Sequence, residues 1–189
     1  MVEEKIEEIL ISEGMIQNRI RELGEQISED YAGKEPIIIS ILKGGVYFLA
    51  DLTRAIKIPL EIDFIVVSSY GDSQETSGIV RLVKDLKEDI RSRHVILVED
   101  IIDTGLTIDY LLGLLRSRRP ASLEVCSLLS KPSRRKIDVP VKYLGFEIPD
   151  KFAVGYGLDY KQYYRNLPFV CVFKPEGSGT PEESGTPEA

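Results

Sequence analysis

Residues that commonly build redox, metal and acyl-transfer sites are scarce in this chain. Its 189 residues include two cysteines, one histidine and no tryptophan. The lone histidine, His94, cannot supply a cluster of metal ligands, and no Ser/His/Asp triad is available to it, so we expect it to be structural. Cys126 and Cys171 both lie inside apolar runs, which indicates reduced core residues of a cytosolic protein and no disulfide or metal site.

The chain also lacks an excess of basic charge and any long hydrophobic run. Lys and Arg number 24 against 31 Asp and Glu, which gives a net charge of −7. A nucleic-acid-binding surface would be basic, and so would a surface for anionic lipids, so we expect neither partner. No apolar run approaches the roughly 20 residues that span a bilayer, and the first residues lack the apolar segment of a signal peptide. We therefore expect a cytoplasmic protein.

Length and composition predict one domain with an ordinary globular core. Hydrophobic residues make up 43% of the chain, which suits a single packed domain of this length, and we place this domain at residues 1–176. Residues 177–189 contain the sequence SGTPE twice, at 178–182 and 184–188, and no large apolar side chain. This composition indicates a disordered acidic tail, with a docking tail as the alternative.

Short apolar runs alternate with helical patterns along the domain. Apolar residues recur at helical spacing from Ile16 to Ile27, which predicts an amphipathic helix over residues 15–27. Further helices are expected at 46–56 and 106–116, and strands at 37–42, 61–67, 79–83, 95–99, 123–129 and 141–146. Strands that alternate with helices predict an α/β fold with a mostly parallel, twisted sheet flanked by helices.

Residues 95–108, VILVEDIIDTGLTI, form the most informative segment. An apolar strand ends in Glu99 and Asp100, and a turn rich in Thr and Gly at 103–107 then opens an apolar helix. Ligands of open α/β sheets bind just beyond the carboxyl ends of such strands, and a turn that enters a helix offers N–H groups to a phosphate. Carboxylates beside a phosphate make sense if they hold ribose hydroxyls or Mg²⁺. The segment therefore predicts a sugar phosphate bound with a metal.

Three other interpretations of this segment fit less well. The triplet Asp103-Thr104-Gly105 also occurs in aspartic proteases, but those proteins are all-β, and this triplet lies between an expected strand and an expected helix. An apolar strand with two acids is also typical of receiver domains, where the acids should lie near the start of the chain. The third interpretation is a purely structural acidic turn, and only other motifs in the chain can weigh against it.

The same segment resembles the 5-phosphoribosyl-1-pyrophosphate (PRPP) signature of type I phosphoribosyltransferases, which is an apolar strand, two acids, two apolar residues and Asp-Thr-Gly-x-Thr. Four more clusters make the chain similar to hypoxanthine-guanine phosphoribosyltransferases over residues 12–174. They are Lys43-Gly44-Gly45, Ser69-Tyr70, Lys131-Pro132, and residues 149–160 with Arg165 beyond. The resemblance implies the type I phosphoribosyltransferase fold, with a small hood built from the terminal segments.

The resemblance also implies how two of these clusters act. The bond between Leu42 and Lys43 is expected to be a cis peptide, a rare feature that clusters at functional sites. Ser69 and Tyr70 head a polar loop, residues 68–78, that is expected to close over the reacting centre. The residues implied in pyrophosphate binding are Lys43, Gly44, Gly45 and Arg165. Taken alone, these clusters would be an ordinary turn, a solvated loop and a surface charge.

The remaining implied roles concern the ribose phosphate, the metal and the purine. Glu99 and Asp100 are expected to hold the ribose hydroxyls, and Asp103 to act as the acid/base group at purine N7. Phe152 is expected to stack on the purine, and Lys131 to contact its 6-oxo group. The implied sets are Asp103, Thr104, Gly105, Leu106 and Thr107 for the 5-phosphate; Lys131, Lys151, Phe152, Ala153 and Asp159 for the purine; and Glu99, Asp100 and Asp159 for Mg²⁺. Taken alone, Lys131 would belong to a solvated basic turn and Phe152 to the core.

The implied activity is transfer of the 5-phosphoribosyl group from PRPP to hypoxanthine or guanine, which yields IMP or GMP and pyrophosphate in purine salvage. The implied cofactor is Mg²⁺, and the implied assembly is a homodimer or homotetramer. Lys131 and Phe152 argue against adenine and pyrimidine bases, whereas xanthine stays open because backbone groups should read the purine 2-position. A non-catalytic sensor of PRPP or nucleotides on the same fold is the other alternative.

Overall fold

A mostly parallel sheet forms the centre of the fold. The computed structural model describes residues 5–69 and 80–174, and its larger sheet has six strands in the order β4-β3-β2-β5-β6-β7. These strands are β2 (Ile37–Leu42), β3 (Glu61–Ser69), β4 (Val80–Lys84), β5 (His94–Ile102), β6 (Ser122–Ser130) and β7 (Tyr143–Glu147). Neighbouring strands are parallel except for β3 and β4. The predicted α/β fold is confirmed.

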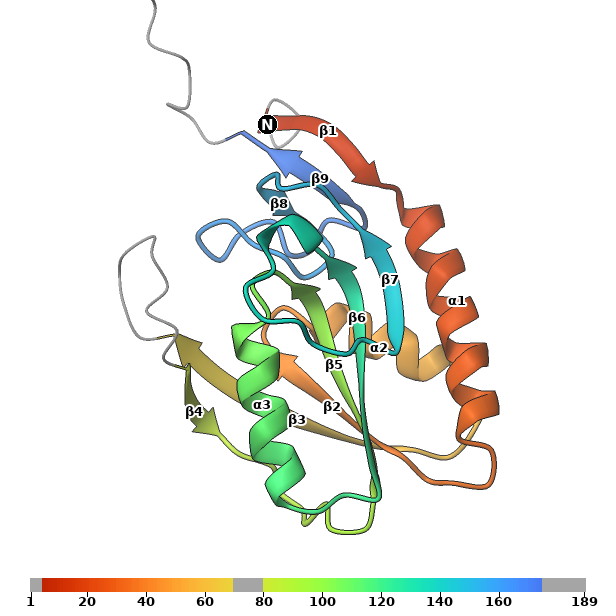
Figure 1. Cartoon of the computed structure of the whole chain (residues 1–189). Coiled ribbons are helices and arrows are strands. Elements are labelled where there is room, and N and C mark those ends of the chain that lie inside the picture. Colours follow the sequence, from red (N-terminus) through yellow and green to blue (C-terminus); the bar gives the residue numbers. More distant parts are fainter. Residues whose placement is uncertain (1–4, 70–79, 175–189) are drawn as a thin grey trace, which may run out of the picture.

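Helices cover both faces of this sheet (Figure 1): α1 (Glu13–Asp30) and α2 (Val46–Ala55) on one, α3 (Leu106–Ser117) on the other. Successive side chains of a strand point to opposite faces. Ile38 and Ile96 accordingly belong to the hydrophobic cluster beneath α1 and α2. Their neighbours Ile39 and Leu97 belong to the cluster beneath α3. Because both faces are buried, the central strands are continuous apolar runs in the sequence.

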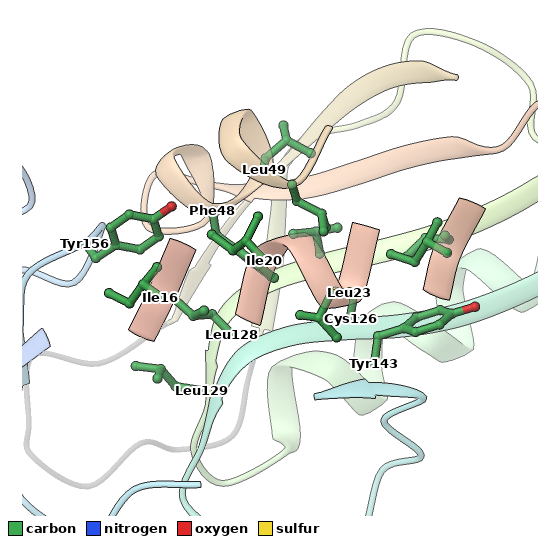
Figure 2. Close-up of a cluster of buried hydrophobic side chains, with 14 of the residues drawn as sticks. Ile16, Ile20, Leu23, Phe48, Leu49, Cys126, Leu128, Leu129, Tyr143 and Tyr156 are labelled. Atoms are coloured by element: carbon green, nitrogen blue, oxygen red, sulfur yellow. The ribbon is translucent and has the colours of Figure 1, made fainter. Parts of the chain in front are cut away.

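The helix predicted at residues 15–27 is confirmed as part of α1. It begins after Ser12, whose side chain accepts a hydrogen bond from the Met15 N–H at 3.3 Å and so caps the helix. Figure 2 shows Ile16 and Ile20 of α1 close to Phe48 of α2, with side chains of β6 on the other side of α1. The apolar face predicted for this helix therefore lies between α2 and the sheet. Both cysteines are buried and free, as predicted.

A second, three-stranded sheet lies beyond the carboxyl ends of the central strands (Figure 1). It joins β1 (Ile6–Ile11), β9 (Val170–Phe173) and β8 (Ala153–Val154) in the order β1-β9-β8, with antiparallel pairing. The expected hood from both terminal segments is confirmed. Its individual strands were not predicted, because β1 (IEEILI) is largely exposed and pairs with the other end of the chain, so that local periodicity does not report it.

Part of the sequence lies outside the described residues. The tail predicted at 177–189 and most of the loop predicted at 68–78 belong to it, so those predictions and the domain boundary at residue 176 stay predictions. Within residues 5–69 and 80–174, no helix combines the length and the hydropathy needed to span a membrane.

Close packing of α1 against α2 generates a stability prediction. A Cβ on Gly24 would lie 2.6 Å from Ala55 Cβ and 2.7 Å from its carbonyl carbon. Overpacking of this kind costs about 1–3 kcal/mol, so Gly24→Ala should lower the urea midpoint of unfolding. Gly113→Ala in α3 is the matched control, because its Cβ would meet no atom of the described residues within 4 Å and alanine is favoured over glycine in a helix by about 0.5–1 kcal/mol. Equal midpoints for the two variants would contradict the close contact.

Candidate active site

Three parallel strands bring the predicted site segments to one edge of the main sheet. β2, β5 and β6 are adjacent and parallel, so their carboxyl ends meet. Lys43 directly follows β2, Asp103 follows β5, and Lys131 follows β6. These three predicted residues therefore lie on neighbouring strand ends, on the side where the hood stands (Figure 1).

The turn between β5 and α3 has the form of an anion-binding turn. Gly105 has a left-handed φ of 87° immediately before Leu106, the first residue of α3, and a Cβ on it would overlap the Ile137 carbonyl oxygen, so only glycine fits. The Thr104 carbonyl accepts hydrogen bonds from the N–H groups of Lys136 (2.9 Å) and Ile137 (3.1 Å), which brace the turn. A cavity of about 100 Å³ is lined by Glu99, Ile101, Ile102, Asp103, Thr104, Gly105, Thr107 and Ile108. The N-terminal end of α3 therefore faces a small cavity, as phosphate sites require.

Glu99 and Asp100 form a buried acid pair at this end of β5. Glu99 is partly exposed as a residue, but its Oε2 atom is buried and has no hydrogen-bond partner within the described residues. Burial, and then the charge of Asp100, raise the pKa of Glu99 well above its ordinary value. Burial also raises the pKa of Asp100, although the Ile101 N–H donates to its Oδ1 at 2.9 Å. The pair is therefore a site that a cation or hydroxyl donors would satisfy.

The donor atoms of this pair fit a Mg²⁺ ion that is shared with a substrate. Mg²⁺ prefers oxygen ligands and usually binds through one or two carboxylates, waters and substrate oxygens. In the parts of the chain that the structure describes, no group of three His, Cys, Asp or Glu side chains could hold a metal alone. Asp159, the third predicted ligand, lies beside Arg165, whose Nη2 is 2.7 Å from Asp159 Oδ1. The residues present thus suit an ion whose coordination a substrate completes.

The turn that follows β2 packs directly on the acid pair. A Cβ on Gly44 would overlap the Asp100 carboxylate, so the glycine permits this close approach. The Leu42–Lys43 peptide bond is cis, as the resemblance predicts, and Gly45 is the N-cap residue of α2. Gly157, with a φ of 103°, packs on the outer side of the turn, since a Cβ there would overlap the Gly44 carbonyl oxygen. The turn is therefore enclosed between β5 and the segment after β8.

A larger open pocket of about 360 Å³ lies next to the turn at residues 103–107. Phe152 on its wall is 50% exposed and stands edge-on to Tyr160, with ring centroids 5.9 Å apart. Lys131 is buried, and its Nζ donates to the Lys151 carbonyl oxygen at 2.8 Å. The lining residues are Ile101, Asp103, Lys131, Arg134, Phe152, Ala153, Leu158 and Asp159. Size and lining are those of a small-molecule site with an aromatic wall and a few polar groups.

Asp103 lies on the boundary of the two cavities and lines both. Arg134 Nε and Asp103 Oδ1 form an ion pair with a distance of 2.8 Å. The geometry of this contact is not that of a hydrogen bond, and Asp103 Oδ1 has no hydrogen-bond partner within the described residues. Arg134 Nη1 is also 3.4 Å from Asp150 Oδ1. Arg134 was not predicted as a site residue, because the short 3-10 helix over Pro132–Arg134 that carries it has no periodic pattern in the sequence.

Other predicted residues take positions that the sequence did not specify. Lys151 contributes its carbonyl group to Lys131, while its Nζ bonds Glu8 Oε2 of β1 at 2.6 Å. Ser69 is the last residue of β3, and Tyr70 lies outside the described residues, so the predicted closure over the site stays a prediction. Gln162 was not predicted at all, because an exposed glutamine in a loop carries no sequence signal. It accepts hydrogen bonds from Lys43 and from Arg165.

Comparison with known proteins agrees with this geometry. The family model of the phosphoribosyl transferase domain matches residues 6–161. The chain belongs to the phosphoribosyltransferase family. Within it, the hypoxanthine-guanine phosphoribosyltransferase of Bacillus subtilis (strain 168) is 47% identical over 175 residues, which cover 93% of this chain and 97% of that protein. The hypoxanthine phosphoribosyltransferase of Salmonella typhimurium (strain LT2) is 50% identical over 165 residues, 86% of this chain and 93% of that protein.

Solved structures show the same phosphoribosyltransferase architecture. A crystal structure of a hypoxanthine phosphoribosyltransferase from Staphylococcus aureus superposes with a TM-score of 0.89 at 46% identity and covers 94% of this chain and 97% of that one. A hypoxanthine-guanine phosphoribosyltransferase from Bacillus anthracis superposes with a TM-score of 0.85 at 48% identity, with 89% and 99% covered. The resemblance read from the motifs is thus confirmed at the level of family and fold.

The raised pKa of Glu99 predicts how the stability of the ligand-free protein depends on pH. A carboxyl group with a higher pKa in the folded chain binds more protons there, so its stabilising contribution is present at low pH and is lost as the pH rises from about 4.3 toward the raised value. Glu99→Gln removes this titration. The variant should therefore lose less free energy of unfolding than the wild type between about pH 5 and pH 8.

Urea unfolding across this pH range measures the difference. Glu25→Gln, on the exposed side of α1, is the control and should follow the wild type. If the free energy of unfolding of Glu99→Gln changes with pH in parallel with that of the wild type, the pKa of Glu99 is not raised in the folded protein.

Proposed function

We propose that the protein transfers the 5-phosphoribosyl group from PRPP to hypoxanthine or guanine, forming IMP or GMP and releasing pyrophosphate in purine salvage. The observation that carries this proposal is the position of Asp103, which lines both the cavity at the turn of residues 103–107 and the pocket walled by Phe152. A group at that boundary can contact the base while the sugar phosphate is held beside it. The names of the similar proteins from Bacillus subtilis and Salmonella typhimurium support the same substrates.

In this proposal PRPP binds along the strand ends. The N–H groups of residues 103–107 and the hydroxyls of Thr104 and Thr107 hold the 5-phosphate at the end of α3. Glu99 and Asp100 accept hydrogen bonds from the ribose hydroxyls, which gives Glu99 Oε2 a donor where the described residues supply none. The pyrophosphate is bound by Lys43, Gly44, Gly45 and Arg165. When bound at Glu99 and Asp100, with Asp159 as a further candidate ligand, Mg²⁺ supplies charge neutralisation at the pyrophosphate.

The transfer itself exchanges one bond at ribose C1. The bond from C1 to the pyrophosphate oxygen breaks as a purine nitrogen bonds to C1, through an oxocarbenium-like state of the kind known from glycoside chemistry. Asp103, as a carboxylate, takes the proton at purine N7 and returns it in the reverse direction. Arg134, 2.8 Å from Asp103 Oδ1, keeps this carboxylate directed at the pocket. Because Asp103 lines both cavities, a sugar phosphate bound in one and a base bound in the other need little motion to react.

Lys131 and Phe152 account for the choice of base. Phe152 stacks on the purine ring, and the Lys131 ammonium group, held by its hydrogen bond to the Lys151 carbonyl, donates to the 6-oxo oxygen. Adenine carries an amine at this position, so a donor would meet a donor and buried polar groups would stay unpaired, which is how large discrimination arises. Xanthine shares the 6-oxo group, so a xanthine-preferring transferase is the second candidate.

Several wider assignments are part of the proposal and rest on the resemblance and on composition. They are a homodimer or homotetramer, a cytoplasmic location, and one domain at residues 1–176 followed by an acidic tail at 177–189. The net charge of −7 supports the view that nucleic acid and anionic membranes are not partners.

The direct test is a spectrophotometric assay with PRPP, Mg²⁺ and one base at a time. Turnover is expected with hypoxanthine or guanine and not with adenine, because Lys131 can pair only with an acceptor at position 6. Preference for xanthine would favour the second candidate. Absence of turnover with all four bases, together with measurable PRPP binding, would overturn the proposed catalysis and favour a sensor of PRPP or nucleotide.

The role of Asp103 is tested by Asp103→Asn, which keeps the shape of the side chain. Turnover should fall by about 10²–10⁴-fold, the usual contribution of a general acid/base group, with little change in the dissociation constant of PRPP. Asp138→Asn is the control, because Asp138 is exposed and lines neither of the two cavities, so turnover should stay that of the wild type. Near-normal turnover of Asp103→Asn would exclude the acid/base role.

A further inference from the structure

The segment after β8 contains a tight turn with two non-glycine residues in the left-handed conformation. Lys161 has a φ of 52° and Gln162 a φ of 72°. The N–H groups of Tyr160 and Tyr163 donate to each other's carbonyl oxygens at 3.1 and 3.0 Å, which closes a two-residue hairpin turn. Turns with positive φ at both central positions favour Gly and Asn, because a Cβ raises the energy of this conformation. Backbone strain of this kind is concentrated where a side chain has a function.

The side chain of Gln162 connects two distant segments of the proposed pyrophosphate site. Its Oε1 atom accepts hydrogen bonds from Lys43 Nζ at 3.2 Å and from Arg165 Nη2 at 3.3 Å. Its backbone N–H donates to Asp159 Oδ2 at 2.8 Å. A single neutral oxygen therefore holds an ammonium and a guanidinium group side by side, although their charges repel each other.

We propose that Gln162 is a positioning residue for pyrophosphate, which holds Lys43 and Arg165 together so that the diphosphate of PRPP meets both cations at once. This inference rests on the proposed function. The amide oxygen aligns the cations without adding negative charge, so it does not compete with the diphosphate electrostatically. Alignment before binding reduces the ordering of long side chains that binding would otherwise require.

A purely structural explanation of Gln162 fits the turn less well. The residue is exposed, so its side-chain hydrogen bonds compete with water and add little to stability. Arg165 is already held by the Gly157 carbonyl at 2.7 Å and by Asp159. Glycine would suit the backbone of the turn better, so the glutamine side chain is explained by ligand binding and not by folding.

The test compares Gln162→Gly, Gln162→Ala and Lys161→Gly with the wild type. Lys161 is the matched control, because it has the same left-handed backbone and its Nζ lies over the Tyr160 ring at 5.3 Å from the centroid. Both Gln162 variants should weaken pyrophosphate binding with Mg²⁺ and raise the KM for PRPP by about three- to tenfold, the effect of one or two lost hydrogen bonds. The KM for hypoxanthine should not change, and Lys161→Gly should bind pyrophosphate as the wild type does.

Thermal unfolding separates positioning from structure. Gln162→Gly should have a higher Tm than Gln162→Ala, because glycine relieves the left-handed strain, yet both should lose the same affinity. If affinity instead follows Tm across the variants, the side chain is structural and the inference is overturned. If the wild type binds pyrophosphate and both Gln162 variants bind equally well, only the inference fails. If the wild type neither binds pyrophosphate nor uses PRPP, the proposed function fails with it.

Discussion

Burial of two adjacent carboxylates, Glu99 and Asp100, is the constraint on which the whole site depends. Removal of an ion from water costs several kcal/mol even after relaxation, and the raised pKa values of both groups reflect this. The Gly44 turn packs on Asp100 and keeps water from it, and the positive charge of Arg165 acts on the same carboxylate. The pair is therefore a local instability within a well-packed domain, and a ligand that supplies hydroxyl donors or a cation relieves it.

The hydrophobic cores on both faces of the sheet hold the strand ends in place despite the buried carboxylates. β2 and β5 are buried on both sides, with alternate residues in two different clusters, so their carboxyl ends cannot shift independently. Turns that extend from such strands are held more precisely than turns on an isolated loop. The close approaches of Gly44 to Asp100 and of Gly105 to Ile137 are possible because the strands beneath them are fixed.

The parts of the site that local sequence patterns report were predictable, and the parts that depend on contacts between distant segments were not. Apolar runs identified the central strands, and the turn at 103–107 follows directly from residue types that bind phosphate. Arg134 and Gln162 have no such pattern, because their importance lies in contacts with Asp103 and with Lys43 that only the folded chain creates. The short hood strands escaped prediction for the same reason, since β1 acquires its structure by pairing with β9.

In the proposed reaction, the main sheet holds the sugar phosphate and the hood sheet holds one wall of the base pocket. The turn at residues 103–107 extends from β5 of the main sheet, whereas Phe152 and Ala153 belong to a segment that pairs with β9, which in turn pairs with β1. The Phe173 N–H donates to the Phe152 carbonyl at 3.0 Å, so β9 fixes the wall of the base pocket. Lys131, which follows β6 of the main sheet, bonds the Lys151 carbonyl beside β8. This bond links the two sheets at the pocket, so the residue proposed to select the base also sets the position of the stacking wall relative to the sugar.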